Sequence, residues 1–376
     1  MNFTYHSRSA RVTFGRGESE SLPQKLAPFN RILVIAGPRF RDRVEQLQNE
    51  MGVKRIVPFS KVLSHVPQDL VDEAAGVVRQ ERPDAILAMG GGSAIGLAKA
   101  LALGLSPELQ ACYFEEGLDA PAIIAVPTTF SGSEQTDIWG ITAGDGKITG
   151  RSPRVLPDLV IYDPELLVSL PVEHAVTSAM NAMAHLVEAV YATDGNPVTR
   201  FQALQGIQAI VNGLRQLGAS ASGDAGSRAI GAMSPDIAEI LLFGAFLGGK
   251  CLREVSMSLE HKAAHVLGGS FGCDHAAVHS VLLPHVLEYQ WPHLDADIRT
   301  DLENAIGANP ARILQDLAMH GGAPANLREI GMEQTDLPRV VDLILEKPYP
   351  SPAPPDRRCL LEMFENAWIG ALQEES

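Results

Sequence analysis

The chain has 376 residues, of which 45% are hydrophobic and 20% are charged, so it is long enough for two compact domains with large cores. Its formal net charge of −15 argues against a general binder of nucleic acids or anionic membranes, because long-range repulsion slows their approach. The sequence has no apolar run of about 18 residues and no secretory signal, so we expect a cytoplasmic protein. These properties favour a small-molecule enzyme, in which a local group of Arg and Lys can still bind an anionic substrate.

The first half of the chain alternates short apolar segments with amphipathic ones. Four apolar, largely β-branched runs, at residues 31–36, 55–58, 84–89 and 122–127, predict buried strands. Amphipathic segments with helical spacing lie between them. Strands that alternate with helices predict a mostly parallel sheet that is covered on both faces.

From residue 164 onward the sequence is rich in Ala, Leu, Met and Glu at helical spacing. The clearest predicted helices are residues 175–193, 198–217, 235–267 and 275–289. The proline-rich segment 347–355 cannot form a regular helix and predicts a loop before a terminal helix. We therefore predict an α/β domain over residues 1–163 and an all-α domain over residues 164–376.

A glycine-rich turn lies between a predicted strand and a predicted helix. The turn consists of Gly90, Gly91, Gly92 and Ser93. Such a turn exposes backbone N–H groups at a helix N-terminus, and glycine lets a phosphate approach them closely. Thr128 and Thr129 follow the next strand, so their hydroxyls belong to the same edge of the sheet. The spacing differs from GxGxxG, and a purely structural turn is the alternative, but nucleotide binding is the favoured interpretation.

Polar pairs recur at a spacing of four residues in the predicted helical domain. The pairs are Asn181 with His185, His261 with His265, and His275 with His279. Residues four apart share one helix face, and imidazoles are common ligands of zinc and iron. Hydrogen-bonded core histidines are the alternative, but several that converge favour a functional site. Asn181 is the weak member, because a neutral amide is a poor substitute for a carboxylate beside a divalent cation.

Five segments resemble the iron-containing alcohol dehydrogenase superfamily. They are residues 90–100, 127–134, 181–189, 261–269 and 275–285. The resemblance covers nearly the whole chain, and within the superfamily the chain is most similar to the maleylacetate reductases. Three details point to that group: Gly96 in the helix after the glycine turn, Asn181 where metal-dependent members have an aspartate, and the segment 152–157.

The resemblance implies a dehydroquinate synthase-like fold, with an N-terminal nucleotide-binding domain, a helical domain, and NADH or NADPH as coenzyme. Metal-dependent relatives bind iron or zinc through an aspartate and three histidines. The corresponding positions are Asn181, His185, His261 and His275. Because one ligand has lost its charge, we expect no bound metal. Gly37 completes the expected coenzyme-binding set. It offers no acidic group to a ribose 2′-hydroxyl, and Arg39 nearby can accept a 2′-phosphate, so either coenzyme is possible.

The implied reaction is reduction of the C=C bond of maleylacetate (4-oxohex-2-enedioate) to 3-oxoadipate in the degradation of aromatic compounds. Hydride addition to the carbon β to the ketone leaves an enolate, whose oxygen needs a preorganised donor. His265, expected near the nicotinamide, or His261 is the candidate donor. His185 and His275 complete the expected catalytic set. The dicarboxylate substrate needs cations, for which a solvated surface role is the alternative. The candidates are Lys147, Arg151, Arg154, Arg253 and Lys262.

Other interpretations remain open from the sequence. One is a metal-dependent alcohol dehydrogenase or carbonyl reductase, and another is a recruited paralogue that acts on a different enone. A third is a nucleotide-binding protein without catalysis, although the presence of four clustered histidines argues against it. The resemblance also implies a homodimer.

Overall fold

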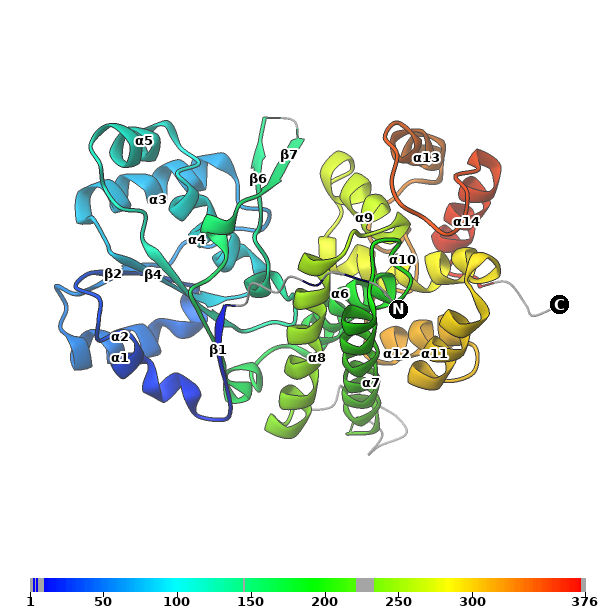
Figure 1. Ribbon diagram of the computed structural model, residues 1–376, viewed down its shortest axis with the longest axis horizontal. Helices are drawn as coiled ribbons and strands as arrows, with labels where there is room; N and C mark the ends of the chain where they lie inside the picture. The colour runs from blue at the N-terminus through cyan, green and yellow to red at the C-terminus, as the bar shows by residue number, and fades with distance from the viewer. Residues whose placement is uncertain (1–2, 4, 6–9, 145, 221–232, 373–376) are drawn as a thin grey trace. The chain divides into compact units, whose positions relative to one another are not determined.

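A computed structural model describes residues 3, 5, 10–144, 146–220 and 233–372 of the protein (Figure 1). The chain forms two compact units. One comprises residues 8–167, and the other comprises residues 168–376 together with Tyr5 near the N-terminus. The division follows the short turn Pro164–Leu167, whereas the sequence analysis places it before that turn.

The first unit is built on a parallel six-stranded sheet. In spatial order its strands are β1 (Arg11–Phe14), β8 (Leu159–Tyr162), β5 (Ala122–Pro127), β4 (Ala85–Gly90), β2 (Ile32–Ala36) and β3 (Ile56–Phe59). The four strands predicted from apolar runs are confirmed as β2, β3, β4 and β5. Strands β1 and β8 are not among the predicted ones; each is four residues long, and β1 is partly exposed.

Helices cover both faces of this sheet (Figure 1). They are α1 (Leu22–Lys25), α2 (Arg41–Met51), α3 (Gln68–Glu81), α4 (Gly92–Leu103) and the short α5 (Pro107–Gln110). Alternate residues of β2, such as Ile32 and Val34, pack in one core with Leu22 and Leu47 of α1 and α2. The residues between them point to the other face, where α4 packs on β4 and β5 with α3 beside it.

An antiparallel hairpin that the sequence analysis misses follows β5. Its strands are β6 (Ile138–Ala143) and β7 (Gly146–Arg151). Gly150 lies opposite Trp139, and a Cβ at position 150 would lie only 2.7 Å from the indole ring. The hairpin therefore needs glycine at this position, and that glycine weakens the strand signal in the sequence.

Within the described residues, the second unit contains helices and no strand. They are α6 (Val172–Val190), α7 (Pro197–Ser220), α8 (Pro235–Glu254), α9 (Leu259–Ser270), α10 (His275–Gln290), α11 (Ala296–Ile306), α12 (Pro310–His320), α13 (Leu337–Leu345) and α14 (Arg357–Ile369). The predicted loop at 347–355 is confirmed between α13 and α14. The Tyr5 hydroxyl donates to the Glu254 carboxylate of α8 at 2.9 Å. No helix among the described residues is long and apolar enough to span a membrane.

One sequence prediction in this unit is wrong, because residues 235–267 form two helices. Val255, directly after α8, has an extended backbone with φ −134° and ψ 164°, and α9 begins at Leu259. The break frees the backbone N–H groups of Ser258 and Glu260, which each donate to the Glu188 carboxylate of α6 at 2.8 Å. A contact with another helix therefore determines the break, and helical periodicity contains no signal for it.

Asp163 ties the end of β8 to the segment that follows β1. Its buried carboxylate accepts the backbone N–H groups of Gly17 at 3.1 Å, Ser19 at 2.9 Å and Glu165 at 3.1 Å.

We expect Asp163→Ala to lower the free energy of unfolding by about 2–3 kcal/mol, because it leaves buried donors unpaired. Asp163→Asn keeps one acceptor oxygen and should lose less. Urea unfolding followed by circular dichroism measures both, and wild-type stability of Asp163→Ala would contradict this role.

His285 is a buried imidazole of α10, and neither ring nitrogen has a hydrogen-bond partner among the described residues. Burial lowers the pKa of His285 to about 4, from about 6.5 in an unfolded chain. Between these values the unfolded chain binds a proton that the folded chain does not. Stability should therefore be complete above pH of about 6.5 and should decrease as the pH falls toward about 4.

We expect His285→Leu to reduce the slope of unfolding free energy against pH in this window by up to about 1.4 kcal/mol per pH unit. Urea unfolding at a series of pH values measures that slope. The matched control is His174→Leu, which removes an exposed imidazole of α6. Equal slopes for the two variants would show that His285 is not the titrating group.

Candidate active site

The glycine turn connects β4 to α4 at the carboxyl edge of the parallel sheet. A Cβ added to Gly90 would lie 2.7 Å from the Cβ of Ala94, and one added to Gly91 would lie 2.9 Å from the Thr129 side chain. Both positions therefore exclude a side chain. The first two residues of α4 are Gly92 and Ser93. The turn thus presents the N–H groups of a helix N-terminus, where an anion such as a phosphate binds favourably.

The predicted threonines lie beside this turn. The backbone N–H of Thr128 donates to the Gly90 carbonyl at 3.0 Å, and the residue is buried. Thr129 is half-buried, and its side chain lies against Gly91. The structure therefore brings together the residues that sequence spacing places on one sheet edge.

Gly37 lies next to the glycine turn at the end of the neighbouring strand. It follows β2, which pairs with β4 through Ala36 and Met89. After β2 the chain adds β3 on one side of the sheet, whereas after β4 it adds β5 on the other side. The strand order therefore reverses between β2 and β4, and ligands bind at such a point. Gly37 has φ −65°, and an added Cβ would have no described atom within 4 Å. Neither the backbone nor packing requires this glycine, which leaves the position open to a ligand.

The predicted substrate-binding cations are distributed over both units. The exposed cations on and just after β7 are Lys147, Arg151 and Arg154. Arg151 forms a 3.4 Å ion pair with Asp137, which immediately precedes β6. Arg253 on α8 and Lys262 on α9 are half-buried residues of the helical unit.

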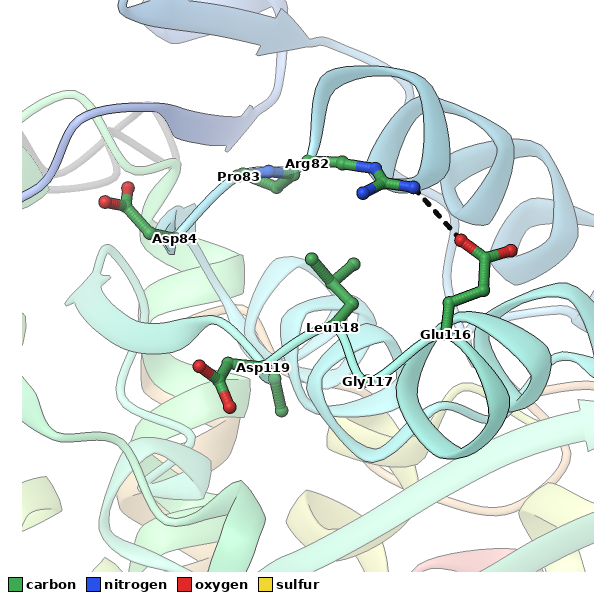
Figure 2. A pocket seen from close by; sticks show the side chains of 8 residues that line it. Arg82, Pro83, Asp84, Glu116, Gly117, Leu118 and Asp119 are labelled. Atoms are coloured by element: carbon green, nitrogen blue, oxygen red, sulfur yellow. Dashed lines mark hydrogen bonds and ion pairs between the residues drawn. The ribbon is translucent and has the colours of Figure 1, made fainter.

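A cavity of about 340 Å³ lies at the opposite end of β4 from the glycine turn (Figure 2). The ion pair between Arg82 and Glu116, at 3.0 Å, lines one side, and Asp84 and Asp119 line the other. The cavity contains none of the predicted site residues. It is therefore not the candidate active site.

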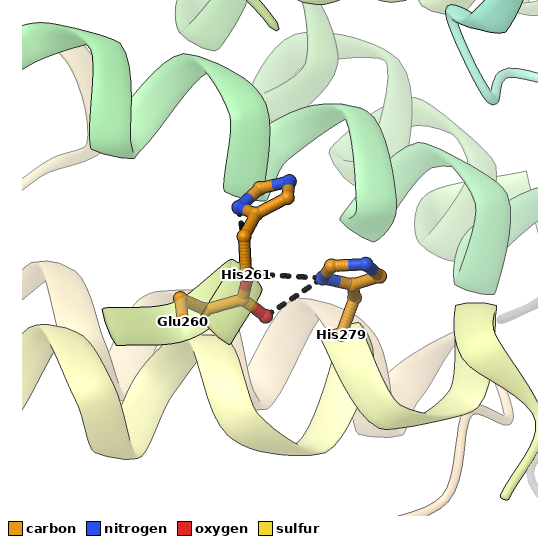
Figure 3. A group of neighbouring side chains, drawn as sticks. All are labelled: Glu260, His261 and His279. Atoms are coloured by element: carbon orange, nitrogen blue, oxygen red, sulfur yellow. Dashed lines mark hydrogen bonds and ion pairs between the residues drawn. The ribbon is translucent and has the colours of Figure 1, made fainter. Parts of the chain in front are cut away.

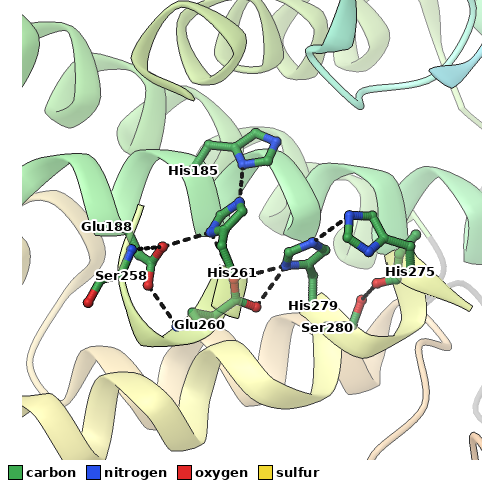
Figure 4. Close-up of polar contacts among 9 residues, drawn as sticks. His185, Glu188, Ser258, Glu260, His261, His275, His279 and Ser280 are labelled. Atoms are coloured by element: carbon green, nitrogen blue, oxygen red, sulfur yellow. Dashed lines mark hydrogen bonds and ion pairs between the residues drawn. The ribbon is translucent and has the colours of Figure 1, made fainter. Parts of the chain in front are cut away.

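A cluster of histidines and glutamates forms where α6, α9 and α10 meet. Glu260, His261 and His279 lie at its centre (Figure 3), and all three are buried. We use the name histidine–glutamate cluster for these three residues together with His185, Glu188 and His275 (Figure 4). Within it, only His275 is more than slightly exposed.

The cluster consists of two chains of hydrogen bonds, each from a glutamate through one histidine to another. In the first chain, Glu188 Oε2 lies 2.7 Å from His261 Nδ1, and His261 Nε2 lies 2.6 Å from His185 Nδ1. In the second, Glu260 Oε1 lies 2.8 Å from His279 Nδ1, and His279 Nε2 lies 3.2 Å from His275 Nε2.

These contacts determine which ring nitrogen of His261 donates. Glu188 accepts two backbone N–H groups as well as the His261 contact, so Nδ1 of His261 is the donor to this carboxylate. A neutral His261 then has a lone pair at Nε2, which accepts from Nδ1–H of His185. The Nε2 atom of His185 is therefore left at the end of the chain.

Burial and charge oppose one another in the cluster. Burial lowers the pKa of His261, but the hydrogen bond to Glu188 and the charges of Glu188 and Glu260 outweigh it, so the pKa is raised. Burial raises the pKa of Glu260, and the nearby Glu188 adds to this rise while His261 opposes it. The cluster therefore retains protons more strongly than the same groups do in water.

Two predicted residues lie outside these chains. His265 is exposed on α9, and its ring is 6.0 Å from that of His275, centroid to centroid. Asn181 lies one turn before His185 on α6, and its buried Oδ1 has no hydrogen-bond partner among the described residues.

Glu188 and Glu260 are not among the predicted site residues, and His279 is predicted only as the partner of His275 at a spacing of four. Local signals for them exist, since Glu188 follows His185 by three residues on the same helix and Glu260 directly precedes His261. What the sequence lacks is the pairing, because each carboxylate binds a histidine of a different segment.

Comparison with known proteins identifies the family. Residues 9–164 match the family model described as iron-containing alcohol dehydrogenase, and residues 175–368 match the C-terminal model of the Fe-containing alcohol dehydrogenase family. The chain belongs to the iron-containing alcohol dehydrogenase family. It is an oxidoreductase of that family, with the fold class that the sequence resemblance implies.

Relatives within the iron-containing alcohol dehydrogenase family include several maleylacetate reductases. One from Pseudomonas sp. strain P51 is 39% identical over 98% of this chain and 99% of its own, and one from Cupriavidus pinatubonensis is 38% identical over 98% of each. The crystal structure of maleylacetate reductase from Rhizobium sp. strain MTP-10005 has a TM-score of 0.85 and 33% identity, covering 98% of this chain and 99% of that one. A putative alcohol dehydrogenase from Ralstonia eutropha JMP134 has a TM-score of 0.87 and 36% identity, covering 100% of both chains.

The family name raises the question of iron, and part of the ligand set that the resemblance implies fits an ion poorly. Two imidazole nitrogens bound to one tetrahedral ion lie roughly 3.3 Å apart, from metal–nitrogen distances of about 2.0–2.1 Å. His185 Nδ1 and His261 Nε2 are only 2.6 Å apart and share a hydrogen bond. Asn181, which the sequence resemblance places at the position of the family aspartate, provides no carboxylate. In the part of the chain that the structure describes, three potential ligand atoms within 4.8 Å of one another belong to Glu260, His261 and His279. In those histidines Nδ1 faces a glutamate, which leaves Nε2 as the nitrogen able to bind an ion, and His279 Nε2 lies 3.2 Å from His275 Nε2.

Glu188 should be essential to the helical unit of this family member. Glu188→Gln places an amide NH₂ against backbone N–H donors, so we expect the free energy of unfolding to fall by about 3 kcal/mol. The proton NMR signal of the His261 Nδ1–H should also move or disappear. Glu173→Gln, an exposed change in the first turn of α6, is the matched control and should cost less than about 0.5 kcal/mol. Equal stability of the two variants would contradict the role of Glu188.

Proposed function

We propose that the protein catalyses the NADH- or NADPH-dependent reduction of the C=C bond of maleylacetate (4-oxohex-2-enedioate) to 3-oxoadipate. The observation that carries this proposal is similarity to maleylacetate reductases at 38–39% identity over 98% of the chain, combined with Asn181 at the family's aspartate position. A role in the degradation of aromatic compounds, a homodimer and a cytoplasmic location stay predictions.

The coenzyme is proposed to bind to the α/β unit. The open position at Gly37, the glycine turn and the threonines beside it lie where the strand order reverses, which is the usual ligand site of such sheets. The phosphates belong at the N-terminus of α4, where Gly92 and Ser93 begin the helix. A bound NADH or NADPH supplies the hydride.

The protein must supply a donor for the developing enolate and a proton for the product. Hydride adds to the alkene carbon β to the ketone, negative charge grows on the ketone oxygen, and the α-carbon then takes a proton. His265 is exposed and is our choice for the donor. His261 is buried with both ring nitrogens in hydrogen bonds, so its proposed role is to orient His185. His275, at the end of the second chain, is the remaining imidazole proposed to meet the substrate.

The two substrate carboxylates need positive charge in a protein of net charge −15. The proposed cations are Lys147, Arg151, Arg154 and Arg253. The ion pair of Arg151 with Asp137 is exposed and weak, so a carboxylate of the substrate can replace Asp137 there at little cost.

We further propose that the reaction needs no metal. The short His185–His261 contact and the neutral Asn181 support this, because they concern three of the four expected ligand positions. Two of these are histidines that are hydrogen-bonded to each other, and the third provides no carboxylate. The hydrogen-bonded cluster then takes over the electrostatic task that a cation performs in metal-dependent chemistry.

The decisive experiment mixes the purified full-length protein with freshly prepared maleylacetate and either NADH or NADPH, and follows the loss of reduced nicotinamide absorbance. We expect turnover that survives chelation and is not increased by zinc or iron(II).

His265→Ala should lower kcat by about 10²–10⁴-fold, the usual range for a lost acid–base or donor group. His320→Ala, at an exposed position of α12, is the control and should leave kcat unchanged.

Other outcomes would redirect the assignment. Turnover that appears only with zinc or iron(II) would contradict metal independence and favour a metal-dependent alcohol dehydrogenase or carbonyl reductase. No turnover in any preparation, with coenzyme still bound, would remove maleylacetate as substrate and point to another enone.

A further inference from the structure

Lys99 of α4 is a buried lysine, only 1% exposed, in the α/β unit. Its ammonium donates to the Ser133 carbonyl at 2.7 Å, to the Thr136 carbonyl and hydroxyl at 2.8 and 3.0 Å, and to the Ile138 carbonyl at 2.9 Å. All four acceptors are neutral. Burying a charge is costly unless hydrogen bonds replace its hydration, so a lysine at this position needs a physical reason.

The segment that Lys99 holds follows directly after the residues beside the glycine turn. Residues 128–132 run beside the glycine turn and lead into the 3₁₀ turn Ser133–Gln135. A Cβ placed on Gly92 would lie 3.5 Å from the Ser131 hydroxyl and 3.8 Å from the Ser133 hydroxyl. Two hydroxyls therefore lie against the first residue of α4, where the coenzyme phosphates are proposed to bind.

The same 3₁₀ turn is held from β8 by Tyr162. The buried Tyr162 hydroxyl donates to the Glu134 carboxylate at 2.7 Å and accepts from the Gln135 side-chain amide at 3.0 Å. The turn is thus attached to α4 through Lys99 and to the sheet through Tyr162. The side chains of Lys99 and Tyr162 are both buried and each forms several hydrogen bonds, so the turn has little freedom to move relative to the glycine turn.

We propose that Lys99 and Tyr162 are positioning residues for the coenzyme, which hold the Ser133–Gln135 turn so that the Ser131 and Ser133 hydroxyls remain within reach of its phosphates. This inference rests on the NADH or NADPH dependence proposed above. Both residues are too deeply buried to touch the coenzyme and act through the turn. Lysine suits the task because a compact ammonium shares its three N–H donors among carbonyls from several directions, which the planar fork of arginine does not match.

The test compares Lys99→Met and Tyr162→Phe with a control residue outside α4 that contacts the carboxyl end of that helix. This control, Tyr113→Phe, removes a hydroxyl that donates to the Leu101 carbonyl of α4 at 3.1 Å, far from the glycine turn. Three quantities are measured: the Kd for NADH by fluorescence titration without substrate, the separate KM values for NADH and maleylacetate, and the Tm.

We expect Lys99→Met to raise the Kd and KM for NADH by about tenfold or more, because a displacement of about 1 Å is enough to lose a well-oriented contact. Tyr162→Phe should raise them in the same direction by less. Lys99→Arg should also bind NADH more weakly than the wild-type protein does. In all these variants the KM for maleylacetate should stay near its wild-type value. Tyr113→Phe should lower the Tm without changing the Kd for NADH.

Wild-type Kd values for NADH in folded Lys99→Met and Tyr162→Phe would overturn the proposal and leave both residues with a structural role only. If Lys99→Met does not fold, Tyr162→Phe and Lys99→Arg decide by the same criterion. The binding measurement contains no maleylacetate. A wild-type protein that binds NADH but does not reduce maleylacetate would therefore contradict the proposed function alone, whereas one that binds neither NADH nor NADPH would overturn both.

Discussion

The buried carboxylate of Glu188 is the contact on which the helical unit depends most. It accepts the first backbone N–H groups of α9 from Ser258 and Glu260, together with the Nδ1–H of His261. A carboxylate at a helix N-terminus satisfies donors that have no partner within the helix and interacts favourably with the helix dipole. One side chain of α6 thus determines where α9 begins and how the His261 ring is oriented before any ligand arrives.

In the α/β unit, too, buried charged side chains each bind several backbone polar groups; one of these side chains is an anion and the other a cation. Asp163 gathers backbone N–H groups after β1 and β8, and Lys99 gathers backbone carbonyls after β5. Irregular backbone near a ligand site carries polar groups that no helix or sheet satisfies. A buried charged side chain satisfies several of them at once, and in return those groups replace its lost hydration. The loops at the candidate coenzyme site are therefore held by buried charges as well as by apolar packing.

In the histidine–glutamate cluster, buried glutamates orient the histidines that are proposed to take part in the reaction. Each glutamate directs one histidine, which in turn directs a second histidine. In the second chain this second histidine, His275, is partly exposed, whereas His185 in the first chain is buried. Supporting contacts of this kind fix the orientation of a reactive imidazole and limit its loss of freedom when substrate binds. In the proposed reaction, the preorganised dipoles and protons of the cluster provide electrostatic stabilisation that the neutral Asn181 does not.

Local patterns in the sequence were sufficient for four strands of the sheet, the all-α second unit, the glycine turn and its neighbours Thr128 and Thr129. Those features depend on periodicity and on glycine between a strand and a helix, which are properties of a few adjacent residues. The break before α9, the β6–β7 hairpin and the roles of Glu188 and Lys99 came only from the tertiary structure. Glu188 and Ser258 are 70 residues apart in sequence, and Lys99 and Thr136 are 37 apart. Contacts between such distant residues satisfy buried polar groups that no local pattern reveals, so folding alone decides which carboxylate meets which histidine.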